Sequence, residues 1–128
     1  MRILLDTHAF LWWLAGDPSL SERARRVIGE EGNVVLLSAA SAWEIATKLR
    51  LGRLPGAARI AGDILGCLRD EGFEPLAVTV GHGQHAGVLP GPHRDPFDRM
   101  LIAQAILENC VLVSNEAEFD AYGVIRLW

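Results

Sequence analysis

The chain has 128 residues and a mass of 14.0 kDa, which is the size of one compact domain. Half of its residues are hydrophobic, and 12 basic against 16 acidic side chains give a formal net charge of −4. This balance excludes a broadly basic protein that coats nucleic acid, because non-specific phosphate binding needs a wide cationic surface. It does not exclude a protein that holds a metal ion with its carboxylates.

Cysteine usage and hydropathy exclude two further classes of protein. Cys67 and Cys110 lack CxxC spacing, and the four histidines lack compact zinc-site spacing, so neither a zinc site nor a disulfide framework is predicted. The longest apolar run, residues 9–15, is far short of the roughly 20 residues that cross a bilayer. The first residues lack the long apolar core of a signal peptide. We therefore expect a cytoplasmic protein without a membrane segment.

The first half of the chain alternates short apolar strands with helices. Residues 3–5 form a continuous apolar run, as expected of a strand buried on both faces. Asp6 and Thr7 follow and can cap a helix over residues 8–15. The next predicted elements are a helix over 22–31 capped by Ser21, a strand over 34–37 and a helix over 39–51 capped by Ser38.

The second half continues this alternation. After a loop over 54–56, a helix is predicted over 57–71, weakened by Gly62 and Gly66. The remaining elements are a strand over 76–80, a helical turn over 84–89, a helix over 96–109, a strand over 111–113, a short helix over 116–122 and a strand over 124–127. Together the elements predict one α/β domain over residues 1–128, with a central, mainly parallel sheet of about five strands covered on both faces.

In parallel sheets, ligands bind beyond the carboxyl ends of the strands, and four acidic residues can reach that edge. Asp6 directly follows the first strand and Glu116 lies just beyond the fourth, while Glu44 and Asp98 lie near the starts of helices. Converging carboxylates raise one another's pKa unless a cation shares them. Oxygen ligands suit Mg²⁺ or Mn²⁺, which can activate water and stabilise the leaving oxygen of a phosphodiester. The four acids therefore predict metal-assisted phosphodiester hydrolysis.

Each acid also has a purely structural interpretation. Asp6 could be only a helix cap, and Glu116 could be only a first-turn acid. Glu44 has a lysine four residues later, which is the spacing of an ordinary helical ion pair. Asp98 could be a first-turn charge favoured by the helix dipole, although Asp95 is placed to cap that helix and leaves Asp98 free. Both interpretations stand for each residue.

Four segments of the chain form an ordered set: LLDTHAFLWWL, SAASAWEIATKLRLGRLP, HRDPFDRMLIAQA and LVSNEAEFDAYGVIRLW. In this order they resemble PIN-domain proteins, and most of all the VapC-like toxins of bacterial toxin–antitoxin modules. The resemblance covers nearly the whole chain. It implies a three-layer α/β/α fold and an endoribonuclease that depends on Mg²⁺ or Mn²⁺.

The same resemblance implies the residues of the site and its partners. Asp6, Glu44 and Asp98 take the places of the family's acids, and Glu116 stands where the family usually has aspartate. Ser114 resembles the family's hydroxyl that supports metal or water. Asp95 and Asp120 are reserve acids. The implied partners are an RNA substrate, a cognate VapB-like antitoxin and a second copy of the chain, as a homodimer within the toxin–antitoxin complex.

Five arginines are candidates to hold the RNA backbone near this acidic site. They are Arg50, Arg53 and Arg59 around one loop, and Arg94 and Arg99 on either side of the segment Asp95–Asp98. For each arginine taken alone, a solvated surface charge is the favoured interpretation.

Three other functions are compatible with acidic residues at the edge of a parallel sheet. A receiver-type phosphotransfer domain needs an aspartate after the middle strand and a lysine after the last, but Gly81 and His82 follow the third strand and the single lysine, Lys48, lies in a helix. A haloacid-dehalogenase-type phosphatase needs a second aspartate where this chain has His8. The stronger alternative is a PIN-fold binding or scaffold protein with weak or no catalysis, which the glutamate at position 116 keeps open.

Overall fold

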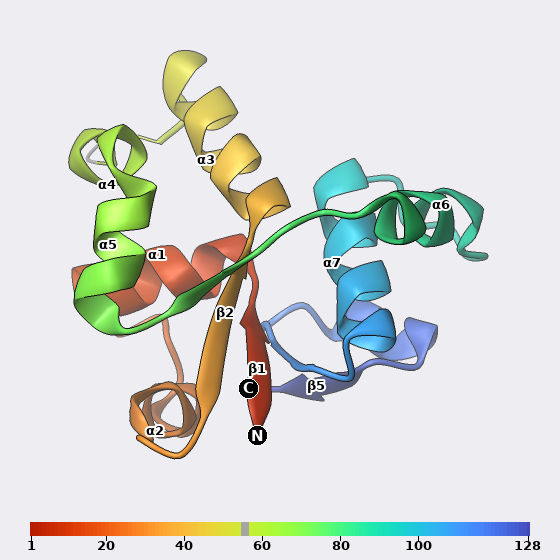
Figure 1. Ribbon diagram of the computed structural model, residues 1–128, viewed down its shortest axis with the longest axis horizontal. Coiled ribbons are helices and arrows are strands. Elements are labelled where there is room, and N and C mark those ends of the chain that lie inside the picture. Colours follow the sequence, from red (N-terminus) through yellow and green to blue (C-terminus); the bar gives the residue numbers. More distant parts are fainter. Residues whose placement is uncertain (55–56) are drawn as a thin grey trace.

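The computed structural model describes residues 1–54 and 57–128 (Figure 1). Five strands form one sheet in the order β3-β2-β1-β4-β5, and every neighbouring pair is parallel. They are β1 (Arg2–Leu5), β2 (Val34–Ser38), β3 (Glu74–Leu76), β4 (Val111–Val113) and β5 (Ile125–Leu127). The predicted α/β fold with a parallel sheet of five strands is confirmed. Two residues of the predicted loop over 54–56, residues 55–56, lie outside the described part of the chain.

Helices cover both faces of this sheet (Figure 1). They are α1 (Thr7–Ala15), α2 (Glu22–Gly29), α3 (Ala39–Arg50), α4 (Ala58–Gly62), α5 (Ile64–Glu71), α6 (Val80–Val88), α7 (Pro96–Leu107) and the 3-10 helix η1 (Ala117–Tyr122). Ile3 and Leu5 of β1 pack in one buried cluster with α1, α2 and α5, whereas Leu4 packs in a second cluster with α7 and η1. Alternate residues of a strand point to opposite faces, so the sheet is the middle of three layers.

Side-chain caps start the helices at the carboxyl edge of the sheet. Asp6 accepts a hydrogen bond of 2.7 Å from the Ala9 N–H and caps α1, and Ser38 caps α3. Asp95 accepts from the N–H groups of Phe97 and Asp98 and caps α7. These three caps agree with the sequence-based prediction, because capping depends on residues only two or three positions apart.

The order in which strands are added to the sheet changes sides at β1. From β1 it runs outward through β2 to β3, and it then crosses to β4 on the other side of β1. Leu5 pairs with Leu37 of β2 and with Val113 of β4, so the residues that follow β1 and β4 emerge side by side. Such a switch point is where α/β sheets bind ligands, and Asp6 and Ser114 lie on its two sides.

The predicted helix over 57–71 is wrong as one element, because the chain forms two helices there. Asp63 leaves the helical conformation and its carboxylate accepts from the Gly66 N–H at 2.9 Å, which caps α5. A Cβ at position 66 would overlap the Asp63 carboxylate, so this cap geometry needs glycine there. The two glycines that weaken the predicted helix thus lie on either side of the break, and Gly66 permits the cap that follows it.

The predicted strand over 76–80 is displaced, and the predicted helical turn over 84–89 is too short. The strand ends at Leu76, and α6 already begins at Val80. Thr79 accepts from the His82 N–H, and His82 Nδ1 accepts from the Thr79 N–H. This reciprocal capping box starts a helix where the β-branched residues Val78, Thr79 and Val80 favour a strand.

The apolar segment that starts α1 lies mainly against the core. Phe10 is fully buried, and residues 11–14 are half-buried against the cluster that contains β1. Trp12 packs against Trp128, with ring centroids 5.8 Å apart, so the last residue is held to the fold. In the described part of the chain, no helix combines the length and apolarity needed to cross a membrane.

Candidate active site

Asp6 is the first acid at the carboxyl edge. The residue is 5 % exposed, and its carboxylate caps α1. Burial raises the pKa of Asp6 above its usual range, and the negative charge of Glu116 adds to this, while the neighbouring Ser114 hydroxyl and the Ala9 N–H oppose it. Asp6 is therefore held rigidly, with another carboxylate near enough to repel it.

Asp98 lies in the first turn of α7, and it is free to take part in the site because Asp95 caps the helix. Because Asp95 takes the capping role, the Asp98 carboxylate does not cap the helix and shares a hydrogen bond of 2.8 Å with Nε2 of His93. Burial raises the pKa of Asp98 to about 7; the charges of Glu116 and Asp95 add to the rise, and the His93 hydrogen bond opposes it. The carboxyl group is therefore close to other acids and only partly exposed to water.

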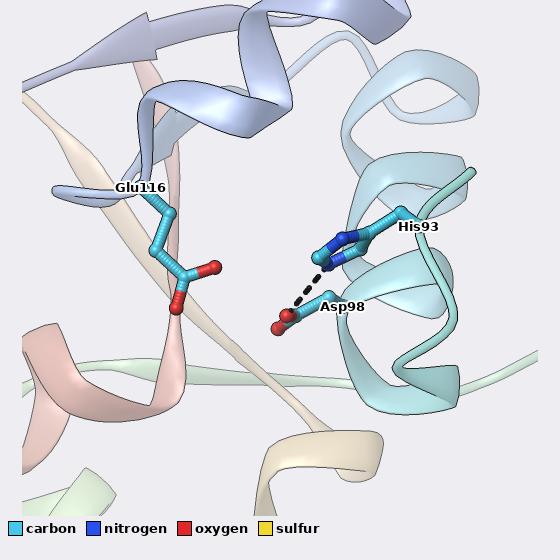
Figure 2. A group of neighbouring side chains, drawn as sticks. All are labelled: His93, Asp98 and Glu116. Atoms are coloured by element: carbon cyan, nitrogen blue, oxygen red, sulfur yellow. Dashed lines mark hydrogen bonds and ion pairs between the residues drawn. The ribbon is translucent and has the colours of Figure 1, made fainter. Parts of the chain in front are cut away.

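Glu116 reaches the same space from the loop after β4. The hydroxyl of Ser114, which is fully buried, accepts from the Glu116 N–H at 3.0 Å and shapes this turn. Figure 2 shows the Glu116 side chain extending toward Asp98 from the opposite wall. The longer glutamate side chain therefore still reaches the acidic site.

Among the described residues, His93, Asp98 and Glu116 can place one ligand atom each within 4.8 Å of one another (Figure 2). We call these three residues the ligand cluster. Asp6 is not one of its three members, but its electrostatic coupling to Glu116 puts it beside the cluster. His93 is not identified from the sequence, because the histidines lack the compact spacing of a zinc site. The feature of the sequence that could have indicated His93 is its position five residues before Asp98, just ahead of Asp95.

Glu44 lies at the same edge of the sheet but outside the ligand cluster. It is 5 % exposed; its Oε1 accepts from the Thr7 hydroxyl at 2.5 Å, and its Oε2 accepts from Lys48 Nζ at 2.6 Å. The helical ion pair considered from the sequence is thus present. Both carboxylate oxygens have protein partners, and through Thr7 the residue supports the chain next to Asp6.

The candidate arginines divide into two groups. Arg50, Arg53, Arg59 and Arg94 are exposed. Arg99 instead donates to three backbone carbonyls, those of Ala86, Leu89 and His93, and so fixes the segment before α7. Its guanidinium supports the site from within the protein. The reserve acid Asp120 is also engaged, because it forms a two-pronged ion pair with Arg126.

A cavity of about 480 Å³ opens beside the ligand cluster. Its lining includes His93, Arg94, Glu118 and Tyr122. An exposed arginine and an aromatic ring thus lie in the same cavity as His93, the member of the ligand cluster that lines it.

Comparison with known proteins agrees with this geometry. The family model of the PIN domain matches residues 3–125. Ribonuclease VapC16 of Mycobacterium tuberculosis is 43% identical over 68 residues, or 53% of this chain. The matched region spans 48% of that protein, so the similarity covers about half of the relative's length.

Three solved structures share the fold over almost their whole length. VapBC2 from Rickettsia felis, bound to a promoter DNA fragment, has a TM-score of 0.73 at 16% identity and covers 99% of this chain and 98% of its own. The sarcin-ricin loop cleaving toxin VapC20 of Mycobacterium tuberculosis has 0.70 at 19% identity and covers 96% of each chain. VapBC-1 from nontypeable Haemophilus influenzae has 0.69 at 16% identity, covering 99% and 97%.

Proposed function

Because this chain belongs to the PIN-domain family, we propose that it is a metal-dependent endoribonuclease and the toxin of a type II toxin–antitoxin module. The observation that carries the proposal is the convergence of Asp98 and Glu116 beside the buried Asp6, at the switch point of a parallel sheet. The similarity to a protein named Ribonuclease VapC16 supports RNA as the substrate.

The residues present fit a divalent cation such as Mg²⁺ or Mn²⁺. Asp6 is buried, Asp98 is partly buried, and Glu116 repels both, so a cation shared among them would offset that repulsion. Carboxylate oxygens are the ligands that these ions prefer. When bound, such an ion supplies an activated water and stabilises the leaving oxygen of a phosphodiester.

The chain's own residues orient this site. Asp6, Asp98 and Glu116 would hold the ion, while Ser114 fixes the turn that carries Glu116 and Asp95 frees Asp98 for the site. We assign Glu44 a positioning role, since its oxygens already accept from Thr7 and Lys48. Arg94 borders the cavity, and we propose it with Arg50 and Arg53 as contacts for RNA phosphates.

Cleavage of RNA by the purified full-length chain tests the catalytic proposal. Fluorescent single-stranded and hairpin RNAs are expected to be cut with Mg²⁺ or Mn²⁺, and chelation should stop the reaction. Asp6→Asn and Asp98→Asn should each lower the rate by roughly 100-fold or more while the protein stays folded by circular dichroism. Asp120→Asn is the matched control, because that carboxylate pairs with Arg126 and should leave the rate unchanged.

The competing function is RNA or protein binding without hydrolysis. It is favoured by the ion pair of Glu44 with Lys48, which occupies an acid that the family resemblance places in catalysis. If wild-type protein binds RNA yet produces no metal-dependent fragments, this alternative replaces the nuclease.

We propose a VapB-like antitoxin and a second copy of this chain as partners. The VapBC structures from Rickettsia felis and Haemophilus influenzae, which share the fold, support such an assembly. A small neighbouring reading frame with a DNA-binding pattern is the first candidate for the antitoxin. Its product should co-purify with this chain and abolish cleavage, and size-exclusion chromatography with light scattering should give a mass that contains two toxin copies.

A further inference from the structure

His93 directs one ring nitrogen into the acidic site. Its Nε2 lies 2.8 Å from Oδ2 of Asp98, and Glu116 faces both from the opposite wall (Figure 2). Two ligands on one metal ion lie at about this separation when each is some 2.1 Å from the ion. The separation of these two atoms is therefore compatible with a shared cation that replaces their hydrogen bond.

The other ring nitrogen has the partner typical of a metal-binding histidine. Nδ1 of His93 lies 3.3 Å from Oε2 of Glu118. A histidine that binds a metal usually donates its second N–H to a carboxylate, which fixes the tautomer and the orientation of the ring. When Nδ1 carries the proton beside Glu118, the lone pair of Nε2 is directed at Asp98 and the site.

Three contacts hold His93 in place before any ligand arrives. Its backbone N–H donates to the Tyr122 hydroxyl at 2.8 Å, and its carbonyl accepts from Arg99 at 3.0 Å. Its ring packs edge-on against Phe119, with centroids 5.7 Å apart. Gly91 permits this arrangement, because a Cβ there would lie 2.7 Å from the Tyr122 hydroxyl. The imidazole is thus preorganised by contacts from α7 and η1.

We propose that Nε2 of His93 binds the same divalent ion as Asp98 and Glu116, with Glu118 orienting the ring, and that the site therefore favours a first-row transition ion over Mg²⁺. Imidazole nitrogen suits transition ions, whereas Mg²⁺ prefers oxygen ligands in a strict octahedron. The inference rests on the proposed function, since it concerns the ion that this nuclease would use.

The direct test is pulsed electron paramagnetic resonance of the full-length chain loaded with Mn²⁺. We expect modulation from a directly bound imidazole nitrogen, and its frequency should shift when the protein carries ¹⁵N-labelled histidine. His93→Gln should abolish that modulation. His85→Gln, which changes a half-buried histidine outside the ligand cluster, is the matched control and should retain it.

Calorimetric titration supplies the second readout. His93→Gln should weaken Mn²⁺ binding by at least about tenfold but change Mg²⁺ binding by less than about threefold. Glu118→Gln should weaken Mn²⁺ binding by roughly tenfold and keep the nitrogen modulation, because it removes only the orienting partner.

The outcomes separate this inference from the proposed function. Mn²⁺ that binds in wild-type protein, is lost in Asp98→Asn and shows no nitrogen modulation would overturn the role of His93 and leave the nuclease intact. Mn²⁺ binding that does not depend on Asp98, together with absent cleavage, would contradict both. The spectrum of wild-type protein decides the first point even if a variant fails to fold.

Discussion

Asp98 shows how one buried side chain couples protonation to stability. Its pKa is raised to about 7 by burial and by neighbouring acids, whereas an unfolded chain ionises the same group near pH 4. Between about pH 4 and pH 7, the folded, metal-free protein therefore keeps a proton on Asp98 that the unfolded chain loses. The contribution of this group to the free energy of unfolding is therefore greatest below about pH 4. It decreases as pH rises from about 4 to about 7 and is lost above that.

This coupling predicts the behaviour of Asp98→Asn in chelator. Near pH 4 the variant and the wild type should have similar stability, and the variant should become relatively more stable as pH rises to 7.5, because asparagine cannot ionise. Urea unfolding at half-unit pH steps measures the difference. A difference that stays constant over this range would contradict the prediction, and Asp120→Asn should not reproduce the rise.

At the scale of a helix, α6 depends on a single side-chain cap. Thr79 forms the capping box with His82, and α6 carries the carbonyl of Ala86 that Arg99 uses to fix the segment before α7. Thr79→Ala should lower the free energy of unfolding by about 1 kcal/mol and speed amide exchange in α6. Thr79→Ser keeps the hydroxyl and should behave nearly as wild type. Equal exchange rates in both variants would show that the cap does not hold this helix.

At the scale of the whole molecule, the proposed metal site joins segments that are far apart in the chain. Asp6 follows β1, Asp98 lies in α7 and Glu116 follows β4, so the unfolded chain has no such site. Divalent ion should therefore stabilise the folded protein, by about 2.7 kcal/mol at 100 times the Kd. Thermal unfolding with increasing Mn²⁺ should show a rising Tm in wild type and Asp120→Asn, and a constant Tm in Asp98→Asn. An equal rise in Asp98→Asn would place the ion elsewhere.

Local chemistry made most of the fold predictable from the sequence. The strand over 111–113 and the caps at Asp6, Ser38 and Asp95 agree with the structure because they depend on residues adjacent in the chain. The alternation of strands and helices then leads to a covered parallel sheet. The break at Asp63 and the early start of α6 were missed, since a side chain there satisfies the backbone in place of the element favoured by propensity.

The sequence by itself determined the order of the elements, the family resemblance and the acids that follow the strands, because periodicity, capping and motif order are local properties of the chain. Only the tertiary structure decided which partner each side chain has. It placed Thr7 against Glu44, directed Arg99 to three backbone carbonyls and brought His93 between Asp98 and Glu118. Most of these pairings depend on which helix packs beside which loop, and that is set by sheet order and burial rather than by spacing along the chain.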